Sequence, residues 1–318
     1  MSVIEVVLFF LLGLALIVKG GDWFLDGAVW IAETTGVPRF IIGATIVSLA
    51  TTLPELTVSI TGVLEGEVDL AVGNAVGSVT ANVGLILGIS VVCLPSLVNK
   101  KQFNFKAILM AAGAALLLFL CRGGVLTVLP SMLLFVIFAL YLGNNLLDAR
   151  SGMAESREGR TERRTVSHRQ TIMKLFLFAI GVTGIVIGSR LLITYGSQLA
   201  LLLGVPSSII GVTMVAVGTS LPELVTTLTA IVKKEASMSV GNIIGANVID
   251  LTLILPACTA VSDGHLQIGS QTTALDLPVC LTLVMTAILP PLLKGRFYRW
   301  QGVVMLALYV GYVVVLVT

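Results

Sequence analysis

Long apolar segments, separated by short polar ones, recur along the whole chain of 318 residues. Most of them reach about 20 residues, the length that a helix needs to cross the hydrocarbon core of a bilayer. The pattern therefore predicts an all-α polytopic membrane protein with ten transmembrane helices. The predicted spans are residues 3–32, 40–63, 69–97, 104–121, 124–147, 171–202, 208–232, 237–261, 273–291 and 298–317.

One motif occurs twice along this pattern. The sequence GATIVSLATTLPE at residues 43–55 returns as GVTMVAVGTSLPE at residues 211–223. The offset is 168 residues, and it also relates Gly73-Asn74 to Gly241-Asn242 without a gap. Self-similarity at one fixed offset indicates two copies of one structural unit. We therefore predict two repeats of five helices each.

The repeat divides the chain into three parts. The two copies are joined by the only long polar segment, DARSGMAESREGRTERRTVSHRQ, for which we predict a flexible linker. The predicted parts are the first repeat 1–147 with its motif region 43–82, the linker 148–170, and the second repeat 171–318 with its motif region 211–250.

Five spans per copy is an odd number, so the second copy must enter the membrane upside down relative to the first. Hydrophobic residues make up 56% of the chain and charged residues 11%, and the mean hydropathy is +1.03, which fits membrane spans rather than soluble domains. With the N-terminus outside, the predicted inner loops hold most of the loop Lys and Arg, whereas the outer loops hold Arg122 alone. This asymmetry predicts a multi-pass protein of the cell membrane, with both termini outside and 148–170 in the cytoplasm. The basic loops then serve as topology signals, so we expect the lipid bilayer and no nucleic acid as a partner.

Each copy carries a proline and a glutamate where a membrane would disfavour them. Pro54 and Pro222 cannot donate a backbone hydrogen bond, so we expect the second span to loosen across Ala50 to Pro54, and the seventh in the same way. A carboxylate at the middle of a membrane costs about 2.5–3.5 kcal/mol on insertion scales. Glu55 and Glu223 therefore need positive charge, and neither span offers a neighbouring Lys or Arg.

The available ligands are hard oxygens: freed carbonyls, threonine hydroxyls and carboxylates. Such oxygens suit Ca²⁺ and Na⁺. The third and eighth spans add Ser78 and Asn82 in the first copy, and Asp250 in the second, where Ala246 stands opposite Ser78. Inverted repeats with interrupted helices are typical of secondary transporters. No nucleophile–base pair or phosphate-binding loop is visible, so we predict a transporter that is not an enzyme and needs no cofactor.

At these motifs the sequence resembles the sodium/calcium exchanger family of the cation/calcium antiporter superfamily, and its prokaryotic members in particular. The resemblance covers nearly the whole chain and implies an antiporter that exchanges Ca²⁺ for Na⁺ by alternating access. It also implies that the first and sixth spans slide as a pair across the other eight. The implied Ca²⁺ ligands are Glu55, Glu223, Thr51 and Thr219. The implied Na⁺ ligands are the positions Ser48, Thr52, Ser78, Asn82, Ala216, Ser220 and Asp250.

Of the departures from the family pattern, one removes a ligand from a sodium site. Ala246 stands where the second repeat of the family has a serine hydroxyl, which leaves the sodium stoichiometry open. The residues themselves also allow two other functions: an antiporter in which the same glutamates exchange H⁺ for Ca²⁺ or another divalent cation, and a channel. We expect a monomer or a weak homo-oligomer.

Overall fold

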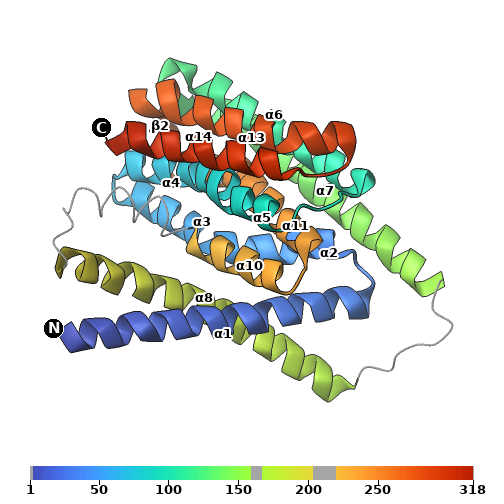
Figure 1. Cartoon of the computed structure of the whole chain (residues 1–318). Coiled ribbons are helices and arrows are strands. Elements are labelled where there is room, and N and C mark those ends of the chain that lie inside the picture. Colours follow the sequence, from blue (N-terminus) through green and yellow to red (C-terminus); the bar gives the residue numbers. More distant parts are fainter. Residues whose placement is uncertain (1–2, 159–166, 203–219, 318) are drawn as a thin grey trace.

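The computed structural model describes residues 3–158, 167–202 and 220–317. Helices account for almost all of this part of the chain (Figure 1). Within it, nine helical segments are long and apolar enough to cross a membrane, and the predicted seventh span, 208–232, is described only from Ser220 onward. The fold is therefore that of an all-α polytopic membrane protein, as the hydropathy pattern predicts.

Each half of the chain is a series of long helices, and several of its spans are divided by short π-helical turns. The first half contains α1 (Val3–Thr35), α2 (Arg39–Ile42), the π turn η1 (Gly43–Val47), α3 (Ser48–Leu64), α4 (Val68–Ala81), the π turn η2 (Asn82–Leu87), α5 (Gly88–Cys93), α6 (Lys100–Leu120), the 3-10 turn η3 (Cys121–Gly123), β1 (Val125–Thr127) and α7 (Val128–Glu158). The second half contains α8 (His168–Leu202), α10 (Leu221–Val232), α11 (Ala236–Ile249), the π turn η4 (Asp250–Ile254), α12 (Leu255–Val261), β2 (His265–Gln267), the π turn η5 (Thr272–Asp276), α13 (Leu277–Lys294) and α14 (Arg299–Val317). The strands β1 and β2 pair antiparallel and link the two halves.

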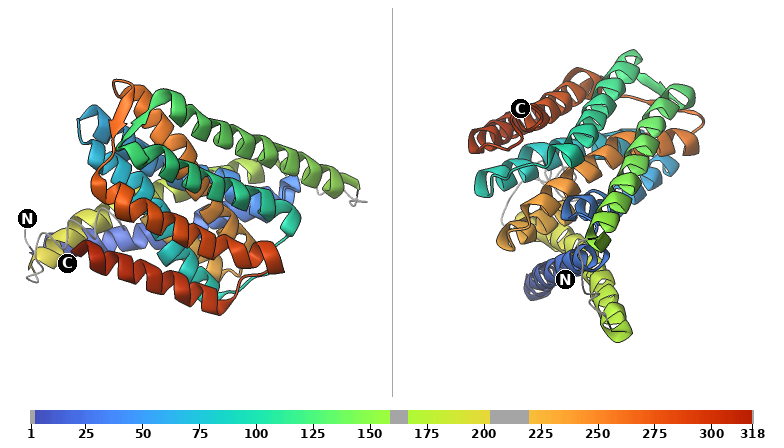
Figure 2. Two further views of the ribbon diagram at one scale, coloured as in Figure 1. Left: turned by 90° about the horizontal axis from the view of Figure 1, so that it is seen from above. Right: turned by 90° about the vertical axis from the view of Figure 1, so that its right-hand side faces the viewer.

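The helices α1 and α8 run antiparallel, side by side along one edge of the molecule (Figures 1 and 2). Their backbones touch at glycines: a Cβ at Gly13 would lie 3.0 Å from the carbonyl of Gly188, and a Cβ at Gly20 would lie 2.9 Å from the carbonyl of Gly181. The repeat offset relates Gly13 to Gly181 and Gly20 to Gly188. Gly13 therefore contacts the repeat mate of Gly20, and Gly20 contacts the repeat mate of Gly13. A twofold axis between antiparallel copies requires this reciprocal pairing. The two repeats are inverted, and both ends of the chain lie at the same end of the molecule (Figure 2).

The hydrophobic interior falls into two clusters. The large one is formed by the helices from α2 to α7 and from α11 to α14, with Phe103, Leu117 and Leu283 among its fully buried members. The small one joins α1 and α8 to the rest through Phe24, Leu25 and their neighbours. The pair α1–α8 thus packs against the other helices through this small cluster.

We predicted a linker over 148–170 from the sequence. In the structure α7 continues as a helix through Glu158, so the predicted linker begins too early. Asp148 forms an ion pair with buried Lys106 of α6, which ties the extension to the bundle. Gly152 lies directly against Pro38, where a Cβ would come within 2.5 Å of the proline ring. Polar composition marked this segment as a linker, but tertiary contacts hold its first half in a helix.

Candidate functional site

Three buried acids mark the centre of the molecule. Glu55 of α3, Glu223 of α10 and Asp250 at the start of η4 are each at most 1% exposed. Glu55 interacts electrostatically with both Glu223 and Asp250, and Asp250 with Glu223. The helices that carry them are in contact with one another. The structure therefore brings together the two glutamates of the repeated motif and adds the aspartate of the eighth span.

Most oxygens of these acids have no hydrogen-bond partner within the described part of the chain. This is true of both carboxylate oxygens of Glu55, both of Asp250, and Oε2 of Glu223. A buried charge that is neither paired nor hydrogen-bonded costs several kcal/mol. Three like charges close together add mutual repulsion. The arrangement therefore favours neutralisation of the carboxylates by bound cations or by protons.

Hydroxyl groups lie beside the acids. Thr52 Oγ1 makes a long contact of 3.5 Å with Glu223 Oε1, and Thr51 lies beside the same carboxylate. The Thr51 hydroxyl also donates to the carbonyl of Ser48 at 3.3 Å. The Ser48 hydroxyl donates to the carbonyl of Thr45 at 3.1 Å. These three predicted ligands therefore line one continuous stretch of the second span.

The remaining predicted ligands are buried where the structure describes them. Ser78, Asn82 and Ser220 are each at most 2% exposed. Neither amide atom of Asn82 has a partner in residues 3–158, 167–202 and 220–317, and the same is true of the Ser220 hydroxyl. Thr219 and Ala216 lie outside the described residues.

Three of the predicted sodium ligands stand next to π-helical turns, whereas Glu55 and Glu223 directly follow the prolines. Asn82 opens η2, Asp250 opens η4, and Ser48 directly follows η1. We predicted the loosening of the second span at Ala50 to Pro54, but the change of hydrogen-bond register lies earlier, at Gly43–Val47. A π turn inserts one extra residue and is frequent at functional sites. Here it coincides with close backbone contact, because a Cβ at Gly43 would collide with the carbonyl of Met238 in α11.

Two asparagines belong to the site although sequence reasoning did not assign them. Asn74 Nδ2 donates to the carbonyl of Glu55 at 3.1 Å and to Ser59 Oγ at 2.9 Å. Asn242 Oδ1 accepts from the Thr51 hydroxyl at 3.4 Å. The signal was present, since Asn74 and Asn242 are repeat mates in the two Gly-Asn pairs, but we had used those pairs only to define the offset.

The acids alone do not make a metal site. Among the described residues, no three His, Cys, Asp or Glu side chains are grouped so that they could hold one ion. A bound cation would therefore need amide, hydroxyl and backbone oxygens as well. Such mixed oxygen sets bind hard cations, Ca²⁺ in particular.

Inverted repeats of membrane-spanning helices around a buried cluster of acids are the architecture of a membrane ion transporter. Comparison with known proteins specifies the family. The model of the sodium/calcium exchanger protein family matches residues 5–147 and, separately, residues 173–318. The chain belongs to the sodium/calcium exchanger family.

Several relatives are similar over their whole length. An uncharacterised membrane protein of Methanocaldococcus jannaschii is 32% identical over 95% of this chain and 95% of its own. A sodium/calcium exchanger of Methanosarcina acetivorans is 29% identical over 97% of both chains. The structure of the sodium-calcium exchanger NCX_Mj soaked with Na⁺ and Sr²⁺ matches with a TM-score of 0.84 and 29% identity, over 98% of this chain and 99% of that one.

Proposed function

We propose that this protein is a secondary antiporter that exchanges Ca²⁺ for Na⁺ across a cell membrane by alternating access. The observation that carries the proposal is the group of buried carboxylates at Glu55, Glu223 and Asp250, whose oxygens largely lack partners in the described chain. The matching family, the relative from Methanosarcina acetivorans and the matched structure support the same pair of ions, because each is named a sodium/calcium exchanger.

The charge of the site explains how the two fluxes are coupled. Three Na⁺ would neutralise three carboxylates, whereas one Ca²⁺ would neutralise two and leave the third to a proton. Ions of either kind therefore compete for the same oxygens. When no ion is bound, the charges of the site are uncompensated in a medium of low dielectric constant. The conformational change that switches the empty site from one side of the membrane to the other is therefore disfavoured. This penalty suppresses leak and enforces exchange.

For the ion ligands we keep the residues that the sequence resemblance implies. We assign Ca²⁺ to Glu55, Glu223 and the backbone oxygens of Thr51 and Thr219. We assign Na⁺ to sites formed at Ser48, Thr52, Ser78, Asn82, Ala216, Ser220 and Asp250. Thr51 and Thr52 lie beside the carboxylate of Glu223, and the Thr51 hydroxyl contacts the carbonyl of Ser48, which supports placing these ligands around one shared centre.

The topology is also a proposal. We infer that 1–147 and 171–318 are the two repeats and that the segment between them faces the cytoplasm, with both termini outside. The excess of Lys and Arg in the loops of that side supports this orientation.

Calcium flux into proteoliposomes tests the function. Glu55→Gln and Glu223→Gln keep the size of each side chain and remove one ligand charge, so we expect sodium-driven Ca²⁺ uptake to fall at least about tenfold, equivalent to about 1.4 kcal/mol. Glu65→Gln serves as a matched control, because Glu65 is exposed at the end of α3 and should leave the flux unchanged. Full transport by either glutamate variant would contradict the assignment.

The coupling ion is tested in the same vesicles by varying the sodium and pH gradients independently. Sodium-driven uptake at constant pH supports Na⁺/Ca²⁺ exchange. Calcium uptake driven by a pH gradient in sodium-free buffer, with no response to sodium, would instead assign an H⁺/Ca²⁺ antiporter that uses the same carboxylates.

A further inference from the structure

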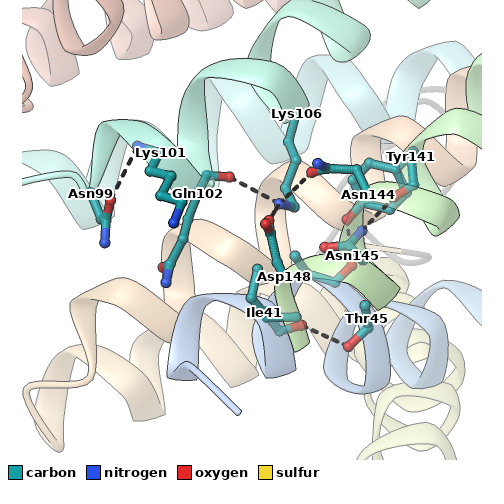
Figure 3. A network of polar contacts seen from close by, with 11 residues as sticks. Ile41, Thr45, Asn99, Lys101, Gln102, Lys106, Tyr141, Asn144, Asn145 and Asp148 are labelled. Atoms are coloured by element: carbon teal, nitrogen blue, oxygen red, sulfur yellow. Dashed lines mark hydrogen bonds and ion pairs between the residues drawn. The ribbon is translucent and has the colours of Figure 1, made fainter. Parts of the chain in front are cut away.

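One face of α7 is polar although the helix lies in an apolar span. Tyr141, Asn145 and Asp148 recur at positions i, i+4 and i+7, which places them on one side of the helix. This face packs against α6 and the first half of the interrupted second span. Figure 3 shows Tyr141 and Asn145 beside each other, one to two turns from the contact between Asp148 and Lys106.

The end of this face at Asp148 is held by a buried cation, Lys106. The side chain of Lys106 is fully buried and pairs with Asp148. Its ammonium group also donates to Asn144 Oδ1 at 2.8 Å and to the carbonyl of Gln102 at 3.0 Å, and it lies 5.8 Å from the ring centre of Phe40 in α2. The position of α7 relative to α6 and α2 is therefore fixed by several contacts rather than by apolar packing alone.

The other end of the face, at Tyr141, contacts the second span, which carries Glu55. The hydroxyl of Tyr141, a residue 1% exposed, donates to the carbonyl of Ala44 inside η1. In a regular α-helix this carbonyl would accept from the N–H of Ser48, four residues on. That N–H bonds instead to the carbonyl of Gly43, five residues back, as a π turn requires. In the π turn the Ala44 carbonyl lacks the N–H of Ser48 as its donor. The Tyr141 hydroxyl donates to that carbonyl in its place.

The opposite side of the same turn is also fixed. A Cβ at Gly245 of α11 would lie 2.5 Å from the hydroxyl oxygen of Ser48 and 2.9 Å from the carbonyl oxygen of Ala44. The turn that ends at Ser48 is thus held between the hydroxyl of Tyr141 and the bare backbone of Gly245. Neither contact is visible in the motif that contains Ser48.

The repeat contains this tyrosine twice. Residues 139–143 read ALYLG and residues 307–311 read ALYVG, at the same offset of 168 that relates the two glutamates. Tyr309 also packs against a π turn, because a Cβ at Gly84 in η2 would lie 2.7 Å from Tyr309 Cβ. The last span of each repeat therefore brings a tyrosine against a π turn of a site-bearing helix.

We propose that Tyr141 is a positioning residue for sodium binding: its hydroxyl holds the η1 turn in the register that aims Ser48 at the ion site. The proposal rests on the proposed function, in which Ser48 contributes to a Na⁺ site and not to the Ca²⁺ site. Removing the hydroxyl therefore weakens sodium binding and leaves calcium binding nearly unchanged.

Tyr141→Phe tests this inference because it keeps the buried ring and removes one hydrogen bond. We expect the sodium concentration for half-maximal Ca²⁺ efflux from proteoliposomes to rise roughly threefold to tenfold, the effect of a hydrogen bond of ordinary strength. The half-saturating Ca²⁺ concentration should change by less than about twofold. Tyr312→Phe is the matched control, since it removes a hydroxyl that donates to Asp276 Oδ1 at 3.0 Å between α14 and η5. It should leave the sodium dependence as in the wild type.

A second readout does not depend on transport. Sodium that binds the folded protein raises its unfolding temperature, so a sodium titration of thermal stability in detergent reports the occupancy of the site. The midpoint of that titration should shift for Tyr141→Phe and not for Tyr312→Phe. Gly245→Ala, which presses on the turn from the other side, should shift it in the same direction. Tyr141→Phe combined with Ser48→Ala should shift it little further than Ser48→Ala alone, because both changes act through one group.

The outcomes separate the two proposals. A wild type whose stability and calcium flux ignore Na⁺ overturns the sodium site and the positioning role together. A wild type that responds to Na⁺, with Tyr141→Phe indistinguishable from it or no different from Tyr312→Phe, overturns only the positioning role. Additive effects of Tyr141→Phe and Ser48→Ala would overturn it as well.

Discussion

At the scale of single residues, the site is defined by oxygens that are buried without enough partners. Glu55, Glu223 and Asp250 carry the charge, and neighbouring hydroxyl and amide groups complete the set of hard donors. The two repeats do not contribute equally, because Ala246 is the repeat mate of Ser78 and offers no side-chain oxygen. If Na⁺ binds at the sites we propose, we expect this asymmetry to make one of them weaker than the other.

Restoring the hydroxyl should strengthen that site. Ala246 is fully buried, so Ala246→Ser adds a hydroxyl oxygen as a possible Na⁺ ligand at the position that corresponds to Ser78 in the first repeat. We expect the half-saturating sodium concentration for Ca²⁺ efflux to fall by roughly threefold to tenfold, since one neutral oxygen contributes about as much as one hydrogen bond. Ala287→Ser, which adds a hydroxyl at a buried position of α13, is the control and should have no such effect. An unchanged sodium dependence in Ala246→Ser would place this position outside the sodium sites.

The residues that could be predicted from the sequence are those that a membrane penalises. Glu55, Glu223 and Asp250 stand out because a carboxylate in an apolar span needs a reason. Asn74 and Tyr141 do not stand out, because an amide among small residues and a tyrosine in a span are ordinary packing residues. Their roles depend on partners 15 and 97 residues away in sequence. Only the internal repeat, read through to the last spans, could have pointed to them.

At the scale of elements, hydropathy located most of the fully described spans within a few residues, because length and apolarity are what a bilayer selects. It could not locate the π turns, because one extra residue in a helix changes the hydrogen-bond register and not the composition. Proline suggested an interruption near Pro54, whereas backbone contact with α11 shifts it to η1. The helical extension of α7 was missed for a related reason, since its stabilising partner Lys106 lies on another span.

The ion pair between Lys106 and Asp148 should therefore be important for stability. Asp148→Ala leaves a fully buried ammonium group without its counter-ion, which costs about 3 kcal/mol or somewhat less, because the Asp148 side chain is 18% exposed. We expect the midpoint of thermal unfolding in detergent to fall by several degrees. Glu33→Ala is the control, because Glu33 pairs with Arg39 at an exposed position and should cost less than about 1 kcal/mol. Equal losses for both variants would show that burial adds nothing to the Lys106 pair.

At the scale of the whole molecule, the inverted repeats form two bodies of unequal size. The pair α1–α8 is joined by its glycine contacts and meets the rest of the molecule through the small apolar cluster. It touches the larger body partly through α10, where Lys233 pairs with Asp26 at 2.7 Å and with Asp22 at 3.4 Å. These pairs are partly exposed and therefore weak enough to break and re-form. Such an interface suits a pair of helices that slides while the glycine contacts within it persist.

If exchange requires this sliding, a covalent link between α1 and α10 should stop it. A Cβ at Gly21 lies 3.8 Å from Cβ of Thr229, which is the usual Cβ separation of a disulfide. We expect Gly21→Cys combined with Thr229→Cys, in a Cys93→Ser background that removes the exposed native thiol, to lose calcium exchange on oxidation and to recover it on reduction. Each cysteine alone is the control and should be insensitive to the oxidant. Because the bond fixes only one contact between the bodies, it should leave Ca²⁺ binding intact, as measured by the calcium-dependent rise in unfolding temperature. Undiminished exchange by the fully oxidised double variant would mean that α1 and α10 keep their contact throughout the transport cycle, and the movement that alternates access would then have to lie within the larger body.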